Sequence, residues 1–107
     1  MNHNAFCTVL TTCNNESIEK QIIKVLLELK LAACIQVMPI ESHYLWKGEV
    51  CCDNERLLII KSTAELFEDI NYKIQELHNY DVPQIVQLPI TAGFNEYLDW
   101  IKASTKT

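Results

Sequence analysis

The sequence predicts an α/β (α+β) domain whose elements follow the order βαββαβ, with a long central hairpin and a closing C-terminal helix. Apolar residues recur at helical spacing in some segments, and runs of β-branched and apolar residues lie between them. Of the 107 residues, 49% are hydrophobic and 21% are charged. This balance predicts a core that needs neither disulfides nor a structural metal. The length suits one domain, which we expect to span residues 1–107.

The first strand and helix are predicted from residues 5–30. Residues 5–12 are rich in β-branched and apolar side chains, which is typical of a strand. Asn14 or Asn15 can cap the amphipathic helix predicted over residues 16–30. Its apolar stripe consists of Ile18, Ile22, Val25, Leu26 and Leu29.

Residues 33–61 are predicted to form a long hairpin that turns at Lys47 and Gly48. Pro39 within the first arm indicates an edge strand or a bulge. The continuous apolar run at residues 57–61 is typical of a strand buried on both faces. Each arm of about fourteen residues would span roughly 46 Å, whereas helices near fifteen residues cover only about 23 Å. The hairpin should therefore protrude, and its exposed edge predicts a homo-oligomer in which each hairpin completes a neighbour's sheet.

The second half of the chain repeats the helix–strand order. Ser62 and Glu65 match a capping box, and a second helix ending near residues 78–80 follows. Its apolar stripe consists of Leu66, Phe67, Ile70, Ile74 and Leu77. Residues 84–90 are predicted to form the last strand, and residues 94–103 a short terminal helix. This order is typical of the ferredoxin-like arrangement, an antiparallel sheet with two helices on one face.

The charge distribution argues against two classes of partner. The net charge is −5, and the nine Lys and Arg residues are scattered along the chain. Neither nucleic acid nor an anionic membrane is therefore an expected partner. Residues 1–4 lack the basic start and apolar run of a signal peptide, and no apolar run has the length of a membrane span. The expected location is cytoplasmic.

The five cysteines contain no Cys-x-x-Cys pair, so we expect them to serve as packing residues or free thiols. Cys51 and Cys52 are adjacent, and neighbours on a strand point to opposite faces. Packing is therefore the favoured interpretation of this pair. In the alternative, one of them forms a soft metal site with His43 on the facing arm.

Several short motifs, spread in order from about Thr8 to Ile101, resemble the CutA family of divalent-cation-tolerance proteins. The motifs are Leu31-Ala32-Ala33-Cys34-Ile35, Pro39, Ser42-x-Tyr44-x-Trp46-x-Gly48, Leu58-Ile59-Ile60-Lys61, Glu76-Leu77-His78-x-Tyr80-x-x-Pro83 and Glu96-Tyr97-Leu98-Asp99-Trp100-Ile101. The resemblance implies a ferredoxin-like fold, a tight homotrimer and a role in the response to metal ions, copper above all. The implied trimer is similar to that of PII-type signalling proteins, whose intersubunit clefts bind small ligands.

The copper site that the resemblance implies is altered in this chain. Some bacterial members have a cysteine where this chain has Thr11, and the family commonly has glutamate where it has Gln84. His78 remains and is the predicted metal ligand, because imidazole binds copper well. The alternative interpretation of His78 is a polar residue near the C-terminus of a helix.

Four residues are predicted to lie at an interface or in a cleft: Tyr44, Trp46, Lys61 and Tyr80. Aromatic side chains on a projecting hairpin are typical interface anchors, although they could also stack on a ligand. Lys61 is either a solvated strand end or, in a cleft, a partner for a carboxylate or phosphate.

The predicted function is that of a trimeric protein of metal-ion response, with a divalent cation such as copper as candidate ligand. The alternative is a PII-like regulator that binds a small anion or nucleotide between subunits. That alternative lacks a glycine-rich phosphate loop, because Gly48 and Gly93 are the only glycines. No catalytic residues are predicted and the chain is not expected to be an enzyme. An acylphosphatase would need an arginine cradle after the first strand, and Arg56 is the only arginine.

Overall fold

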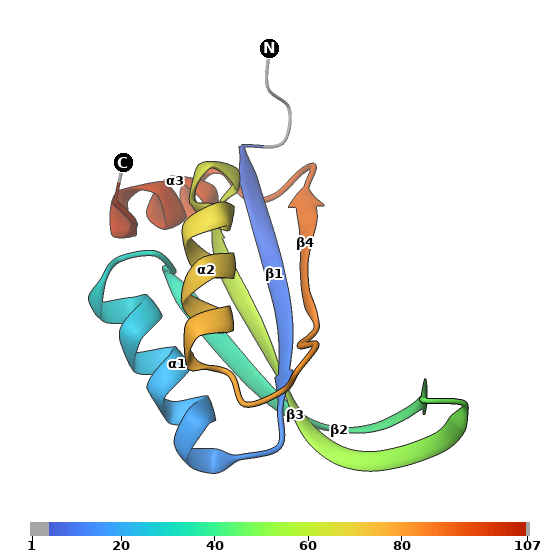
Figure 1. Ribbon diagram of the computed structural model, residues 1–107. Coiled ribbons are helices and arrows are strands. Elements are labelled where there is room, and N and C mark those ends of the chain that lie inside the picture. Colours follow the sequence, from blue (N-terminus) through green and yellow to red (C-terminus); the bar gives the residue numbers. More distant parts are fainter. Residues whose placement is uncertain (1–4, 107) are drawn as a thin grey trace.

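The computed structural model describes residues 5–106, and its elements follow the predicted order (Figure 1). Residues 1–4, on which the absence of a signal peptide was judged, lie outside the described residues. One four-stranded antiparallel sheet has the strand order β2-β3-β1-β4. The elements are β1 (Phe6–Cys13), α1 (Glu16–Glu28), β2 (Cys34–Trp46), β3 (Glu49–Thr63), a 3-10 turn (Ala64–Leu66), α2 (Phe67–Leu77), β4 (Ile85–Ile90) and α3 (Asn95–Ser104). The predicted ferredoxin-like α+β fold is confirmed.

The core lies between the sheet and the two helices α1 and α2, which cover the same face (Figure 1). Strand alternation and helical spacing direct one set of apolar side chains into this layer. The fully buried members include Val9, Ile22, Leu26, Leu58, Ile60, Ile70 and Ile74. Most of the apolar stripes predicted for the two helices therefore lie in the core, whereas Leu29 at the end of α1 is exposed.

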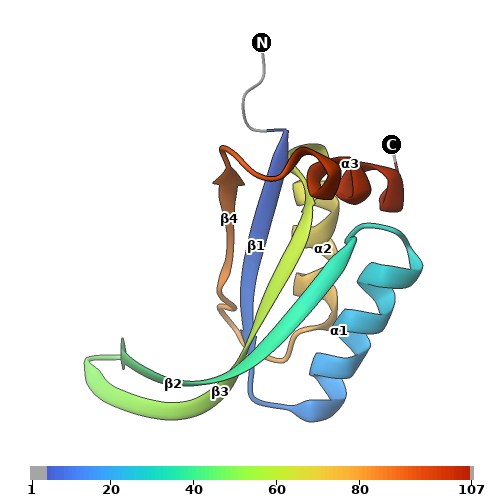
Figure 2. The same cartoon turned by 180° about the vertical axis from the view of Figure 1, so that it is seen from behind.

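The opposite face of the sheet has no covering helix from α1 or α2, and we call it the open face (Figure 2). Leu58 and Ile60 of β3 are buried, whereas Leu57 and Ile59 are only partly so. The prediction that this run is buried on both faces is wrong for the single chain, because only one side carries a second layer. The apolar side chains of the open face are Leu10, Met38, Leu57, Ile59, Val86 and Leu88.

Helix α1 begins as predicted and ends two residues early. The Asn15 side chain accepts a hydrogen bond from the Ile18 amide at 3.0 Å, which is an N-cap. At the other end Lys30 has a positive φ of 58°. The Leu31 amide donates to the Leu26 carbonyl at 2.9 Å, and that of Lys30 donates to the Leu27 carbonyl at 3.1 Å. These two bonds form a Schellman motif, which ends the helix and turns the chain toward β2.

The predicted capping box at Ser62 is wrong. Ser62 is a fully buried residue of β3, and its hydroxyl donates to the Leu31 carbonyl at 2.5 Å. A buried hydroxyl needs a partner, and the loop after α1 supplies one. The strand therefore continues to Thr63, a 3-10 turn follows, and α2 begins at Phe67 without a side-chain cap.

The β2–β3 hairpin projects beyond the helices, as predicted (Figures 1 and 2). Its register is continuous from Cys34 opposite Lys61 to Trp46 opposite Glu49, so Pro39 sits on an edge strand without a bulge. Lys47 and Gly48 have φ values of 51° and 79°, which suit a two-residue hairpin turn of type I′. We call residues 40–55 the arm and the rest of the described chain the body.

Helix α3 lies across the end of the sheet where β3 finishes (Figure 2). Ile101 is buried there, and the Lys106 amide donates to the Lys30 carbonyl at 2.9 Å. The last helix is thus tied to the end of α1. Within residues 5–106, no helix is both long and apolar enough to cross a membrane.

Candidate functional site

His78 caps the C-terminus of α2 and connects two segments of the body. Its Nδ1 accepts a hydrogen bond from the Tyr80 amide at 3.1 Å. A neutral imidazole that accepts at Nδ1 carries its proton on Nε2. That nitrogen lies 2.7 Å from the Thr12 carbonyl oxygen, to which it donates. Both ring nitrogens are therefore engaged, and they hold the loop after α2 against the end of β1.

This geometry constrains the predicted role of His78 as a metal ligand, which stays a prediction. A cation can take a ring nitrogen only by displacing one of the two hydrogen bonds. The Cys13 sulfur lies 3.9 Å from Nε2, but burial, followed by the charges of Glu19 and Glu55, raises the pKa of that thiol to about 11. The thiol is therefore protonated at neutral pH.

The other two positions of the implied copper site lie in different environments. Thr11 is fully buried on the helix-covered face, and its hydroxyl has no hydrogen-bond partner among residues 5–106. Gln84 instead lines a surface pocket beside the arm. Within the described chain, His78 belongs to no group of three neighbouring His, Cys, Asp or Glu side chains that could share an ion.

The pocket beside the arm has a volume of about 570 Å³. The arm forms one wall and the loop after α2 forms another. Its lining includes Thr12, Ser42, His43, Tyr44, Trp46, Asp53, Glu55, Tyr80, Asp81, Val82 and Gln84. Three of the four predicted interface or cleft residues, Tyr44, Trp46 and Tyr80, are thus brought together. We call this cavity the arm pocket.

Two tyrosine–carboxylate pairs line the arm pocket. The Tyr80 hydroxyl donates to Glu55 at 2.5 Å, and the Tyr44 hydroxyl donates to Asp53. The hydrogen bond to Asp53 is the main cause that raises the pKa of Tyr44 to about 12. Burial, then the bond to Glu55, raises the pKa of Tyr80. Both phenols are neutral at physiological pH, so the carboxylates give the pocket an acidic character that favours cations over anions.

Lys61, the fourth predicted residue, does not line the arm pocket. Its amine donates to the Gln36 side chain at 3.0 Å and lies 5.9 Å from the centre of the Tyr97 ring. It is therefore on the open face beside α3, and its role at an interface or in a cleft stays a prediction.

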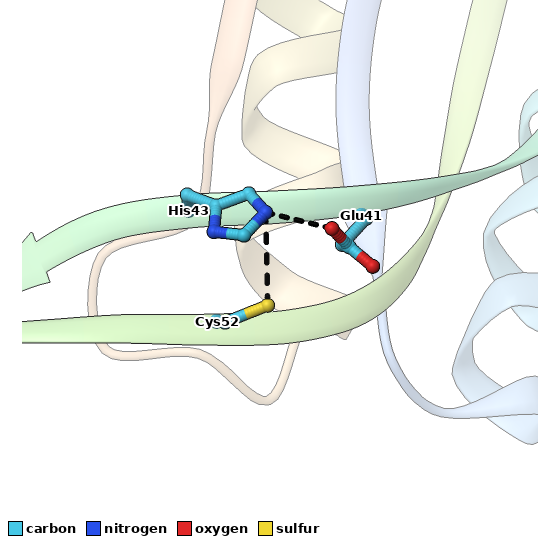
Figure 3. A group of neighbouring side chains, drawn as sticks. All are labelled: Glu41, His43 and Cys52. Atoms are coloured by element: carbon cyan, nitrogen blue, oxygen red, sulfur yellow. Dashed lines mark hydrogen bonds and ion pairs between the residues drawn. The ribbon is translucent and has the colours of Figure 1, made fainter.

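The arm also carries a second group of ligand-forming side chains, Glu41, His43 and Cys52 (Figure 3). One potential donor atom from each residue lies within 4.8 Å of the others, and all three residues are exposed. The pairing of His43 with a cysteine of the facing strand was one of the two interpretations that the sequence left open. Glu41 was missed, although the two-residue alternation along β2 places it on the same face as His43.

Comparisons with known proteins identify close relatives. A family model described as "CutA1 divalent ion tolerance protein" matches residues 7–104. The divalent-cation tolerance protein CutA of Thermus thermophilus is 44% identical over 91% of this chain and 95% of its own length. The chloroplastic CutA of Arabidopsis thaliana is 42% identical over 92% of this chain, but the match spans 54% of that protein.

Solved structures agree with the sequence matches. The CutA protein of Archaeoglobus fulgidus superimposes with a TM-score of 0.91 and 33% identity, and the match covers 94% of this chain and 99% of that one. The Thermus thermophilus protein gives a TM-score of 0.90 with 42% identity over the same shares. The fold of the described residues is therefore that of the solved CutA proteins.

The names of these relatives contradict the predicted cytoplasmic location. The plant relatives are named chloroplastic, and the Archaeoglobus fulgidus structure is described as a periplasmic protein. The same fold thus occurs in proteins assigned to other compartments. The prediction rested on the first residues and the composition, and neither determines the compartment of this domain.

Proposed function

The chain belongs to the CutA1 divalent ion tolerance family, and we propose that it acts in divalent-cation tolerance as a homotrimer that binds the cation in clefts between subunits. The role in divalent-cation tolerance is proposed because the relatives are named for it. The single observation that supports a homotrimer is the apolar open face of the sheet.

The open face carries a group of partly exposed apolar side chains beside the polar Lys61 and Gln36. Met38, Val86 and Leu88 are 46%, 41% and 48% exposed. Met38 pairs with Leu57, Val86 pairs with Leu10 and through it reaches Ile59, and Leu88 lies in the next row. An antiparallel sheet that faces water normally presents polar side chains on that side. A contiguous apolar surface of this kind indicates a protein interface.

The arm continues this face beyond the body. Alternation along β2 places Tyr44 and Trp46 on the same side of the strand as Met38. An arm that extends beyond its own body can contact a neighbour head to tail, and such contacts form a ring when the rotation closes. We take the ring to have three copies, as the family resemblance implies. Each arm would then cover the arm pocket of a neighbouring subunit or complete its wall.

The arm pocket is the proposed cation cleft. Asp53, Glu55 and Asp81 give it carboxylates, and His78 lies behind Tyr80, with the two ring centres 4.4 Å apart. We place His78 as the imidazole ligand through Nδ1, which requires that nitrogen to exchange the Tyr80 amide for the metal while Nε2 keeps donating to the Thr12 carbonyl. The alternative ligand, a small anion, gains little support because these acidic groups repel it and Lys61 lies elsewhere.

Sedimentation velocity tests the assembly. The wild-type protein should sediment at about three times the 12.4 kDa chain mass. Leu88→Lys should give monomers, because a charge cannot be buried unpaired in the interface. Leu29→Lys is the matched control, because Leu29 is exposed to 44% but lies at the end of α1, and it should remain a trimer. A monomeric wild type contradicts the proposal, as does dissociation by the control but not by Leu88→Lys.

Calorimetric titration with Cu²⁺ tests the cleft. A Cys51→Ser, Cys52→Ser background removes the thiols of the arm, so that thiol binding there does not mask the contribution of His78. In this background, His78→Gln should weaken copper binding by about tenfold or more, because an amide is a poor copper ligand. Equal affinity with and without His78 would exclude it as a ligand.

A further inference from the structure

We propose that Glu41, His43 and Cys52 form a separate binding site on the arm for one divalent transition-metal ion of the zinc class. This goes beyond the proposed function, because the site uses other residues and is complete within one chain. His43 also borders the arm pocket, whereas Glu41 and Cys52 do not line it.

The regular ladder of the hairpin positions all three side chains. Cys52 of β3 stands directly opposite His43 of β2, and Glu41 precedes His43 by two residues on the same face. Tyr44 and Cys51, which face each other one position along, point to the other side. The proposed site is thus on the face of the arm that a trimer built through the open face leaves uncovered.

The distances are close to those that a tetrahedral ion needs. Zinc binds nitrogen, oxygen and thiolate at about 2.0–2.3 Å, which places neighbouring donors roughly 3.3–3.7 Å apart. His43 Nε2 lies 3.8 Å from the Cys52 sulfur and 2.7 Å from a Glu41 carboxylate oxygen (Figure 3). The shorter separation is a hydrogen bond, which opens when the metal takes the place of the proton. Small rotations of exposed side chains complete the geometry.

An exposed glutamate–histidine pair by itself would be an ordinary surface contact that contributes little to stability. The thiol distinguishes this group, because cysteine is usually buried and Cys52 is exposed beside an imidazole and a carboxylate. Thiolate and imidazole select zinc-class ions, whereas magnesium and calcium prefer oxygen ligands. Three protein ligands on an exposed strand pair leave the fourth position to water.

Cobalt(II) titration of the full chain tests the site, because cobalt reports a bound thiolate by its charge-transfer absorption. The wild type should bind one cobalt ion per chain with this absorption, and zinc should displace it. Cys52→Ser and His43→Ala should each abolish the absorption and weaken binding by about tenfold or more. Cys51→Ser is the matched control, one residue away on the opposite face, and it should bind as the wild type does.

Several outcomes overturn the inference: no cobalt binding by the wild type, unchanged binding by Cys52→Ser, or equal loss with Cys51→Ser. Loss of the cobalt absorption in His78→Gln but not in Cys52→Ser would assign the ion to the cleft instead. The Leu88→Lys variant separates the two proposals. Its cobalt binding should match the wild type even where the trimer is lost or never forms.

Discussion

The body and the arm are stabilised in different ways, although the same two strands run through both. In the body, side chains such as Ile60 and Ile74 are fully removed from solvent between the sheet and the helices. In the arm, residues 40–55, no residue is buried. Within one chain, the arm is held by the hydrogen bonds of the strand ladder, by cross-strand side-chain pairs and by the bond from Tyr80 of the body to Glu55. An isolated pair of strands is marginally stable in water.

This difference indicates that the residues that specify the fold lie in the body, whereas many of the candidate functional residues lie in the arm. Apolar burial in the body is sufficient to specify the fold, since the periodic stripes all point there. The arm carries the aromatic residues Tyr44 and Trp46 and the Glu41–His43–Cys52 group, which contribute no core. We therefore expect changes in the body to act on stability, and changes in the arm to act on assembly and metal binding.

The largest effect is expected from Ile60→Ala in the body. Ile60 is fully buried, so the change should lower the free energy of unfolding by about 2–5 kcal/mol. Val50→Ala in the arm is the control, because Val50 is exposed to 80% and its loss should change stability by less than about 0.5 kcal/mol. Urea unfolding at one fixed protein concentration measures both. Similar losses for the two variants would remove the distinction between body and arm.

A smaller effect is expected where the arm joins the body. Arg56 of β3 lies 3.2 Å from a carboxylate oxygen of Glu19 on α1, and the Glu19 side chain is only 8% exposed. Arg56→Met leaves this carboxylate without its charged partner. We expect a loss of about 1 kcal/mol, because the exposed half of Arg56 is screened by solvent.

Lys20→Met is the control for the Arg56 variant. It removes a pair with Glu16 in which both side chains are largely exposed, so the unfolding free energy should barely change. A loss equal to that of Arg56→Met would show that burial of Glu19 is irrelevant.

A loss of stability that appears only at high pH is also expected, and it originates in the body. Burial raises the pKa of Cys7 and Cys13 from 9.0 to about 11. Folding thus favours the protonated thiols. Their contribution is complete below pH 9 and is lost as the pH rises from 9 to about 11. Urea midpoints over this range should fall less steeply for Cys13→Ala than for the wild type, and identical slopes would contradict the assignment.

Much of the body could be predicted from local patterns, and the exceptions have a common cause. A helix cap at Asn14 or Asn15 and most of both apolar stripes could be predicted from local spacing, and the structure assigns the cap to Asn15. The run at residues 57–61 looked buried on both faces because alternation does not say whether a second layer covers each face. Ser62 matched a capping box, but the Leu31 carbonyl, which is distant in sequence, gave its hydroxyl a partner and the strand continued.

The candidate sites were less predictable, because they depend on contacts across the fold. The sequence indicated Tyr44, Trp46 and Tyr80 as cleft residues, and they do line one pocket. Lys61 lies outside that pocket on the open face, where its amine donates to Gln36, and its predicted role at an interface stays a prediction. The two backbone contacts of His78 could not be predicted, because they come from Thr12 and from the loop at Tyr80.

Hydrogen exchange of the arm amides is the most direct test of the central claim. That claim is that contacts with neighbouring copies order the arm, whereas contacts within one chain order the body. Amides of residues 40–55 should exchange slowly in the wild-type protein and much faster in Leu88→Lys, because an isolated strand pair opens readily. Amides of β1 and α2 in the body should keep most of their protection in both. Arm exchange that is equally slow in the monomeric variant would contradict the central claim.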